Sequence, residues 1–175
     1  PLSSGHQEML IDGTRTQQTG ADFGIYEVGV NLLAARTNVL GYTIWLTPID
    51  VAHTVKIPSP TTSEVVVTNP TIPGLELRIP QGTVITDHNG KTVTDISLTL
   101  IPLDRPPFPL PQGVDVPIYF TIQPGAAYLN VQNTSGPKGA RLIYPNIKNY
   151  LAGARIDFWN YDPDEKGWFI YGQGT

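Results

Sequence analysis

Residues 114–122 read Val-Asp-Val-Pro-Ile-Tyr-Phe-Thr-Ile, so that every second side chain is apolar. The residues of the apolar set are Val114, Val116, Ile118, Phe120 and Ile122. Alternation with a period of two is typical of a β-strand that buries one face. Pro117 has no backbone N–H, so this strand is expected at a sheet edge or at a bulge.

The same alternation recurs along the chain. Residues 75–79 place Leu, Leu and Ile on one face, and residues 96–100 place Ile, Leu and Leu there. Further strands are expected at 8–11, 25–32, 42–46, 54–57, 64–68, 128–131, 140–144, 155–161 and 168–171. Many short strands separated by turn residues predict an all-β fold of one or more antiparallel β-sandwiches with short proline- and glycine-rich connections and little helix.

Proline and glycine explain why little helix is expected. Each occurs 17 times, and prolines recur from Pro48 to Pro145. A proline inside a helix costs about 3 kcal/mol. Only a turn or two of helix is expected, at residues 146–151, ended by Gly153.

Two hairpins and one stiff connection are predicted from the turn residues. Asn89-Gly90 favours a type I′ turn between strands at 83–87 and 92–100. Residues 162–167 are expected to join the last two strands. Residues 105–111, Arg-Pro-Pro-Phe-Pro-Leu-Pro, resemble polyproline II. They suit either a ligand for a proline-recognising domain or, as the close flanking strands favour, a crossover that packs Phe108 and Leu110 against the sandwich.

Composition argues against several classes of partner. The net charge is -4, and only 15% of residues are charged, so there is no basic stripe for nucleic acid or for an anionic membrane surface. No run of about 18 apolar residues occurs, so no membrane insertion is predicted. The chain has no cysteine, which excludes disulfides, zinc–thiolate sites and cysteine nucleophiles.

The sequence offers little catalytic or metal chemistry. Asp50, His53 and Ser59 are near one another, but no Gly-x-Ser-x-Gly elbow is present. The chain is therefore predicted not to be an enzyme, and a self-processing or hydrolytic domain is the remote alternative. No cofactor is predicted. The weak metal candidates are two acidic clusters, Asp162, Asp164 and Glu165, and Asp87, Asn89 and Asp95; neither has calcium-loop spacing, and Asx turns explain both.

The C-terminal stretch is rich in aromatic residues. Two paired strands there would direct Trp159 and Tyr161 towards solvent, and stacked rings beside Asp and Asn side chains suit carbohydrate. The candidate ligand-binding residues are Trp159, Tyr161, Trp168 and Tyr171. The alternative is that aromatic cross-strand pairs stabilise the hairpin and fill the core.

From about residue 42 the chain resembles bacterial Rhs/YD-repeat proteins, which are very large exported toxin shells. The resemblance rests on Gly-Tyr-Thr-Ile-Trp-Leu-Thr-Pro-Ile-Asp (41–50), Ile-Pro-Ser-Pro-Thr-Thr (57–62), Pro-Gly-Leu-Glu-Leu-Arg-Ile-Pro-Gln-Gly-Thr-Val-Ile (73–85), Ile-Pro-Leu-Asp-Arg-Pro-Pro-Phe-Pro-Leu-Pro (101–111), Tyr-Phe-Thr-Ile-Gln-Pro-Gly (119–125), Gly-Pro-Lys-Gly-Ala-Arg-Leu-Ile-Tyr-Pro-Asn (136–146) and Phe-Trp-Asn-Tyr-Asp-Pro (158–163). It covers roughly three quarters of the chain and implies a bacterial, secreted or cell-surface location. The toxin activity of such proteins would lie outside this segment.

Two shorter resemblances suggest a division of the chain. Residues 77–84 and the following Asn-Gly turn are similar to a ZU5 domain, a β-sandwich. Residues 6–46 resemble the last strands of a carboxypeptidase-regulatory-like domain, whose first strands would precede Pro1. The expected domains are therefore 1–46 and 47–175. Some ZU5-containing proteins cleave themselves at His-Phe-Ser, which does not occur here.

Together these resemblances imply a non-catalytic spacer or scaffold module whose partners are neighbouring domains of the same polypeptide. The alternative is a module that binds a glycan or a protein partner through the C-terminal aromatic residues.

Overall fold

The structure, a computed structural model, describes residues 3–16, 20–132, 136, 138–164 and 167–175. It confirms the predicted all-β class, because helix is limited to two short 3₁₀ segments, η1 (Gly13–Arg15) and η2 (Val51–His53), in these residues. The strands are β1 (Gly5–Asp12), β2 (Ile25–Leu32), β3 (Val55–Lys56), β4 (Val65–Thr68), β5 (Glu76–Ile79), β6 (Thr83–Thr86), β7 (Asp95–Leu100), β8 (Phe120–Gln123), β9 (Tyr128–Val131), β10 (Arg141–Ile143), β11 (Ile156–Asp162) and β12 (Gly167–Gly174). None of the described residues belongs to a helix that is long and apolar enough to cross a membrane.

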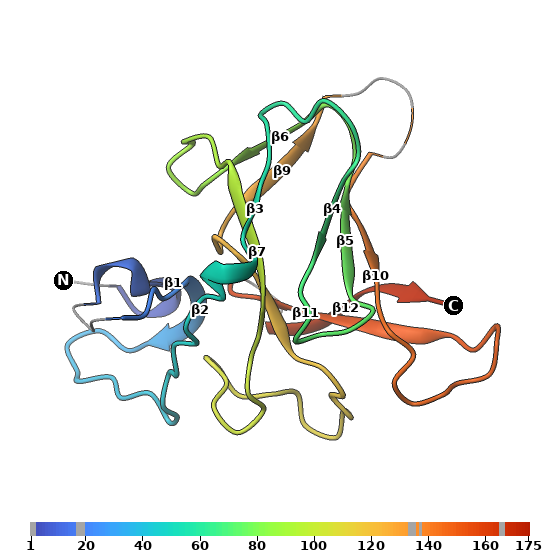
Figure 1. Ribbon diagram of the computed structural model, residues 1–175. Coiled ribbons are helices and arrows are strands. Elements are labelled where there is room, and N and C mark those ends of the chain that lie inside the picture. Colours follow the sequence, from blue (N-terminus) through green and yellow to red (C-terminus); the bar gives the residue numbers. More distant parts are fainter. Residues whose placement is uncertain (1–2, 17–19, 133–135, 137, 165–166) are drawn as a thin grey trace.

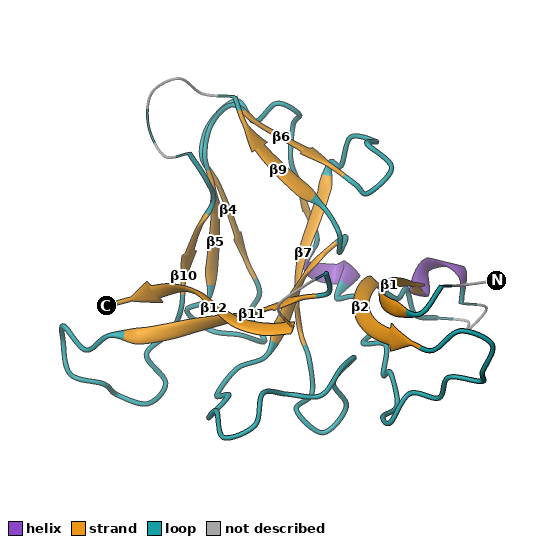
Figure 2. Cartoon of the chain, turned by 180° about the vertical axis from the view of Figure 1, so that it is seen from behind, coloured by secondary structure: helices purple, strands orange, loops and turns teal. Residues whose placement is uncertain are grey.

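The strands pair in small antiparallel sheets, with the orders β1–β2, β10–β5–β4, β3–β7–β8, β6–β9 and β11–β12 (Figure 1). Seen from behind, the β10–β5–β4 sheet forms one wall, and β7 with the β6–β9 pair forms the other (Figure 2). The β11–β12 hairpin crosses below both walls, and the β1–β2 hairpin extends to the side away from β10. The body of the molecule is therefore sandwich-like.

The first core lies between the two walls. Its centre comes from β4, β5 and β7, where Val67, Ile79 and Leu98 are completely buried. Leu77 and Ile79 face this core and Glu76 and Arg78 do not, as the alternation in this segment predicts.

The second core brings together residues from the N-terminal and C-terminal hairpins. Tyr26 and Val28 of β2 pack with Phe108 and Tyr119, and Tyr161 of β11 packs against the same cluster. This core contains residues from both sides of the boundary expected near residue 46. The first hairpin therefore shares buried surface with the last one.

Gln123, at the end of β8, connects the body to the first hairpin through side-chain hydrogen bonds. Its buried side-chain oxygen accepts hydrogen bonds from the backbone N–H groups of Ile25 (3.1 Å) and Gly125 (2.8 Å). Its Nε2 donates to Thr121 Oγ1 at 2.9 Å. A side-chain amide offers the same donor and acceptor groups as a peptide, so Gln123 replaces strand pairing between β2 and β8.

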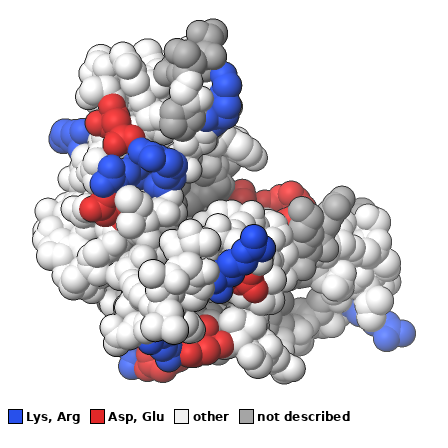
Figure 3. Space-filling model, turned by 90° about the vertical axis from the view of Figure 1, so that its right-hand side faces the viewer, with Lys and Arg blue, Asp and Glu red and all other residues white. Residues whose placement is uncertain are grey.

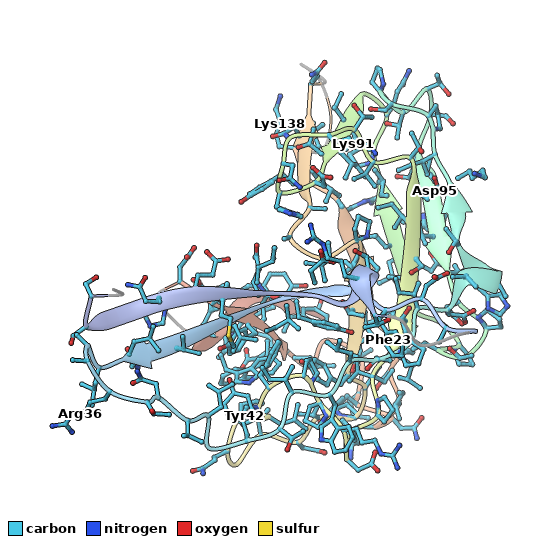
Figure 4. The ribbon with its side chains drawn as sticks, turned by 90° about the vertical axis from the view of Figure 1, so that its left-hand side faces the viewer. Phe23, Arg36, Tyr42, Lys91, Asp95 and Lys138 are labelled. Atoms are coloured by element: carbon cyan, nitrogen blue, oxygen red, sulfur yellow. The ribbon has the colours of Figure 1, made fainter. Side chains whose placement is uncertain are left out.

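Figure 4 shows how the first hairpin lies on the body. Phe23 sits where the hairpin meets the body, and it forms an isolated bridge with Pro48. Arg36 marks the far end of the hairpin, and Tyr42 lies beneath it. Tyr42, Ile44 and Leu46 pack against the second core, although residues 42–46 form no strand; that strand prediction was wrong.

The predicted strand at 114–122 forms only in part. Regular pairing begins at Phe120, where β8 meets β7. Before it, Val114, Val116 and Ile118 are half-buried, and Asp115 and Pro117 are exposed, so the burial alternates over 114–118 although these residues belong to no strand. The alternation ends at Tyr119, which is buried in the second core and whose carbonyl accepts a hydrogen bond from the Ile101 N–H at 2.8 Å. Pro117 lies before the paired part of this segment, and the part that does pair, β8, is the edge strand of its sheet.

The prediction of a short helix at 146–151 is wrong, because these residues form turns. The side chain of Asn146 forms two hydrogen bonds with the backbone of Tyr150, to its N–H (2.8 Å) and to its carbonyl (2.9 Å). Asn149 has a left-handed backbone, with φ of 53°. Asparagine side chains compete in this way with helical hydrogen bonds, and the segment becomes a series of turns.

The turn at Asn89-Gly90 forms, but it is not a type I′ hairpin turn. Gly90 has a positive φ of 77°, whereas Asn89 does not have a positive φ. The Asp87 carboxylate instead accepts hydrogen bonds from the N–H groups of Asn89 (2.9 Å) and Lys91 (2.8 Å). The flanking segments pair only at an isolated bridge, Thr86 with Thr92, and β6 finds its main partner in β9.

Candidate functional site

The β11–β12 hairpin positions the four aromatic residues that the sequence proposes for ligand binding. The predicted hairpin is confirmed, with Tyr161 opposite Trp168 and Trp159 opposite Ile170. Phe158 faces Gly172, so Tyr171 has no cross-strand partner and is the extra residue of a bulge. A bulge re-aims side chains, so Tyr171 departs from the alternation that Trp168 and Ile170 follow along β12.

Two of the four rings are engaged by the chain's own proline-rich run at 105–111. Phe108 stacks on Tyr161 with ring centroids 3.9 Å apart. The indole Nε1 of Trp168 donates a hydrogen bond to the Pro109 carbonyl oxygen at 2.6 Å. Aromatic grooves bind proline-rich segments in recognition domains in the same manner, but here both parts belong to one chain. The prediction that residues 105–111 pack Phe108 against the sandwich is confirmed.

The other two rings are on the surface. Trp159 is 37% exposed, and Tyr171 is 51% exposed. Trp159 and Tyr161 were expected to face solvent together, but Phe108 covers only Tyr161. The structure therefore divides the predicted platform into a covered pair and an exposed pair.

A cavity of about 970 Å³ adjoins this hairpin. One wall comes from residues 114–122, the other from residues 140–148, and the hairpin residues 156–161 also line it. Tyr144 spans the walls: its hydroxyl donates to the Ile118 carbonyl at 3.1 Å, and burial raises the pKa of Tyr144 to about 12, so the hydroxyl remains a donor. The cavity was not predicted, although the alternation at 114–122 did mark one wall.

The catalytic alternative names Asp50, His53 and Ser59. Among the described residues, the structure pairs Asp50 with His53. His53 Nδ1 lies 2.7 Å from Asp50 Oδ2, and the side-chain amide of Asn69 donates to the same oxygen at 2.8 Å. In the described part of the chain, Ser59 makes no hydrogen bond with His53, so the three residues named by the catalytic alternative are not brought together. Asn69 also donates to the Leu98 carbonyl at 2.7 Å, which gives this cluster a structural task.

The Asp50 cluster predicts a loss of stability in acid. The hydrogen bond from Asn69, followed by that from His53, lowers the pKa of Asp50 below its ordinary value. A carboxyl group with a depressed pKa contributes stability above the pKa of the unfolded state, and the contribution disappears as the pH falls through the folded-state pKa. We expect Asp50→Asn to flatten the decline in unfolding free energy between about pH 5 and pH 3, measured by denaturant titration.

Asp104→Asn is the control for that experiment, because Asp104 is exposed and lies 3.7 Å from Arg105. Its acid profile should match that of the unmodified chain. An unchanged profile for Asp50→Asn would show that the cluster does not contribute to acid sensitivity.

The predicted metal candidates do not converge among the described residues. Asp162 accepts a hydrogen bond from the Asp164 N–H at 2.9 Å, which is an Asx turn, and Glu165 lies outside the described residues. Asp95 pairs with Lys56 at 3.1 Å, whereas Asp87 caps its own turn. No group of three or more His, Cys, Asp or Glu side chains suited to a metal occurs in the described ranges.

Comparisons with known proteins give no relative for this chain: no family model, no curated protein and no solved structure matches it.

Proposed function

We propose that this chain is a non-catalytic scaffold module that holds neighbouring domains of a larger exported polypeptide at a fixed spacing. The observation that carries the proposal is the attachment of the first hairpin to the last. Tyr161 Oη accepts a hydrogen bond from the Gly29 N–H at 3.2 Å, and His6 Nε2 donates to the Pro163 carbonyl at 2.6 Å. The contacts join β1 and β2 to the C-terminal hairpin.

Backbone stiffness supports the same role. Prolines and short turns reduce the freedom of the unfolded chain, which favours a single folded form. The resemblance to Rhs/YD-repeat proteins supports a bacterial secreted or cell-surface location.

Limited proteolysis of the folded chain tests the role of the hairpin attachment. A Cβ atom at Gly29 would lie 2.2 Å from the Pro163 carbonyl oxygen and 2.8 Å from His6 Cε1. We expect Gly29→Ala to loosen this contact and to speed cleavage within residues 3–32 about tenfold, since overpacking costs about 1–3 kcal/mol.

Gly172→Ala is the matched control, because a Cβ atom at this strand glycine would have open space around it. Its digestion should follow that of the unmodified chain. Rapid native digestion of the unmodified chain would contradict the scaffold role itself.

A second candidate, binding of a glycan, is favoured by the exposure of Trp159 and Tyr171. Exposed aromatic rings on a rigid hairpin provide flat apolar faces on which sugar rings stack. A glycan-array screen of the whole chain tests this candidate, and an array without signal would discard it.

A further inference from the structure

The first core is sealed on one side of the sandwich and open on the other. On the sealed side, Val67 of β4 and Leu98 of β7 are completely buried. On the other side, Phe120 and Ile122 of β8 and Leu142 of β10 pack against the same core but remain half-buried. These half-buried side chains line the 970 Å³ cavity, which is therefore a groove into the core.

The groove is bordered by strand edges. In the described residues β8 pairs only with β7 and β10 pairs only with β5, so one side of each strand lacks a backbone partner. Residues 114–118, which precede β8, also form no backbone ladder. Backbone N–H and C=O groups along such edges are a template for another strand.

The two walls are not paired with each other, because β8 and β10 belong to different sheets. The side chain of Tyr144 reaches from one wall to the other and donates a hydrogen bond to the Ile118 carbonyl. Farther along, Lys148 Nζ meets Asp115 Oδ2 at 2.7 Å. Paired strands lie about 4.8 Å apart and join through their backbones, whereas these walls meet through side chains.

The rim of the groove carries exposed apolar side chains beside the Lys148–Asp115 ion pair. Three exposed side chains from the β10 wall line it, Ile143, Ile147 and Tyr150, together with Trp159 of the hairpin. The side of the molecule that carries β10 shows charged groups of both signs in contact with each other and uncharged surface between them (Figure 3). Such a surface suits an apolar partner better than a charged one.

We propose that this groove binds an extended segment of a partner protein, with alternating apolar residues, that adds a strand along the free edges of β8 and β10. A strand satisfies the unpaired backbone groups, and its apolar face covers Phe120, Ile122 and Leu142. A lipid or a glycan would cover the apolar side chains but could not form a ladder with both edges. The inference does not depend on the scaffold role, because it rests on the free strand edges of β8 and β10 and not on the attachment of the first hairpin.

The test uses the whole chain and a capped ten-residue peptide in which valine alternates with threonine and lysine. Main-chain hydrogen bonds supply much of the affinity in strand addition, so an unspecialised peptide is a fair probe. We expect saturable binding, and slower hydrogen exchange of backbone amides in 120–123 and 141–143. A peptide with proline at alternate positions lacks the backbone donors and should not bind.

Two isoleucines provide matched variants. Ile143 in β10 is 42% exposed and lines the groove, whereas Ile170 in β12 is 45% exposed and does not. Ile143→Lys should weaken peptide binding about tenfold, and Ile170→Lys should change it less than about twofold.

Three results would overturn the inference. Equal binding of the proline peptide would show an apolar groove without strand pairing. If palmitate or a glycan binds more tightly than the valine peptide and displaces it, the groove would be assigned to that ligand. Failure of the valine peptide to bind at millimolar concentration would remove the docking role altogether.

Discussion

Replacing Phe108 with alanine is expected to lower the free energy of unfolding by about 3–5 kcal/mol, which corresponds to a fall in Tm of roughly 6–20 °C. Phe108 is only 8% exposed, and its ring contacts three others. Besides stacking on Tyr161, it meets Tyr119 and Trp168 edge-on, with centroids 6.3 and 5.7 Å away. Its removal leaves a cavity at the point where the first and last hairpins join.

Two variants make this expectation specific. Phe108→Leu preserves most of the volume but loses the ring contacts, so a smaller loss of about 1–2 kcal/mol is expected. Tyr128→Ala removes a ring that is 62% exposed and should change stability by less than about 0.5 kcal/mol. Chemical denaturation followed by tryptophan fluorescence measures all three. A loss below about 1 kcal/mol for Phe108→Ala would mean that the second core does not hold the hairpins together.

Local pattern was sufficient to predict most strands. Residues 25–32 and 128–131 form strands with the expected bounds, because alternation and flanking turn residues are both local properties. Residues 75–79 also bury the expected face. The failures at 42–46 and 146–151 have different causes. The first segment packs its apolar residues without a backbone partner, and the second satisfies its backbone through the Asn146 side chain.

Strand partners could not be predicted, because alternation fixes which face is buried and not which strand lies alongside. β6 was expected to pair across the Asn89-Gly90 turn, but its ladder is formed with β9. The same limit hid the groove. Its borders are strand edges that stay unpaired in the described residues. Alternation marked the buried face of residues 114–122 but could not show which strand edge remains free.

The candidate ligand-binding residues show why the exposure of a side chain could not be predicted from the sequence. Trp159 and Tyr161 are two positions apart on one strand, a spacing that places them on the same face. Whether a face is covered depends on a distant segment, here the proline-rich run that brings Phe108 onto Tyr161. The sequence identified that run as stiff and apolar, but the surface that receives it is formed by tertiary packing.

Leu98→Ala is expected to destabilise the chain by about 2–5 kcal/mol, through loss of buried apolar surface and creation of a cavity. Leu98 lies in the middle of β7, between β3 and β8 in the sheet order, and is completely buried in the first core. Leu100, two residues further along the same strand, is 41% exposed and provides the control. Both substitutions change the same residue type in the same strand, so intrinsic strand preference largely cancels between them.

The difference in unfolding free energy between the Leu98→Ala and Leu100→Ala variants reports how tightly the sealed side of the first core is packed. If the walls pack together as described, Leu98→Ala should lower the denaturant midpoint strongly without changing the slope, and Leu100→Ala should lower it by less than half as much. Similar effects of the two substitutions would show that the walls do not enclose a packed core at Leu98. In that case the half-buried side chains along β8 and β10 would belong to a loosely packed interior, and the groove between them would lack the fixed edges that strand addition requires.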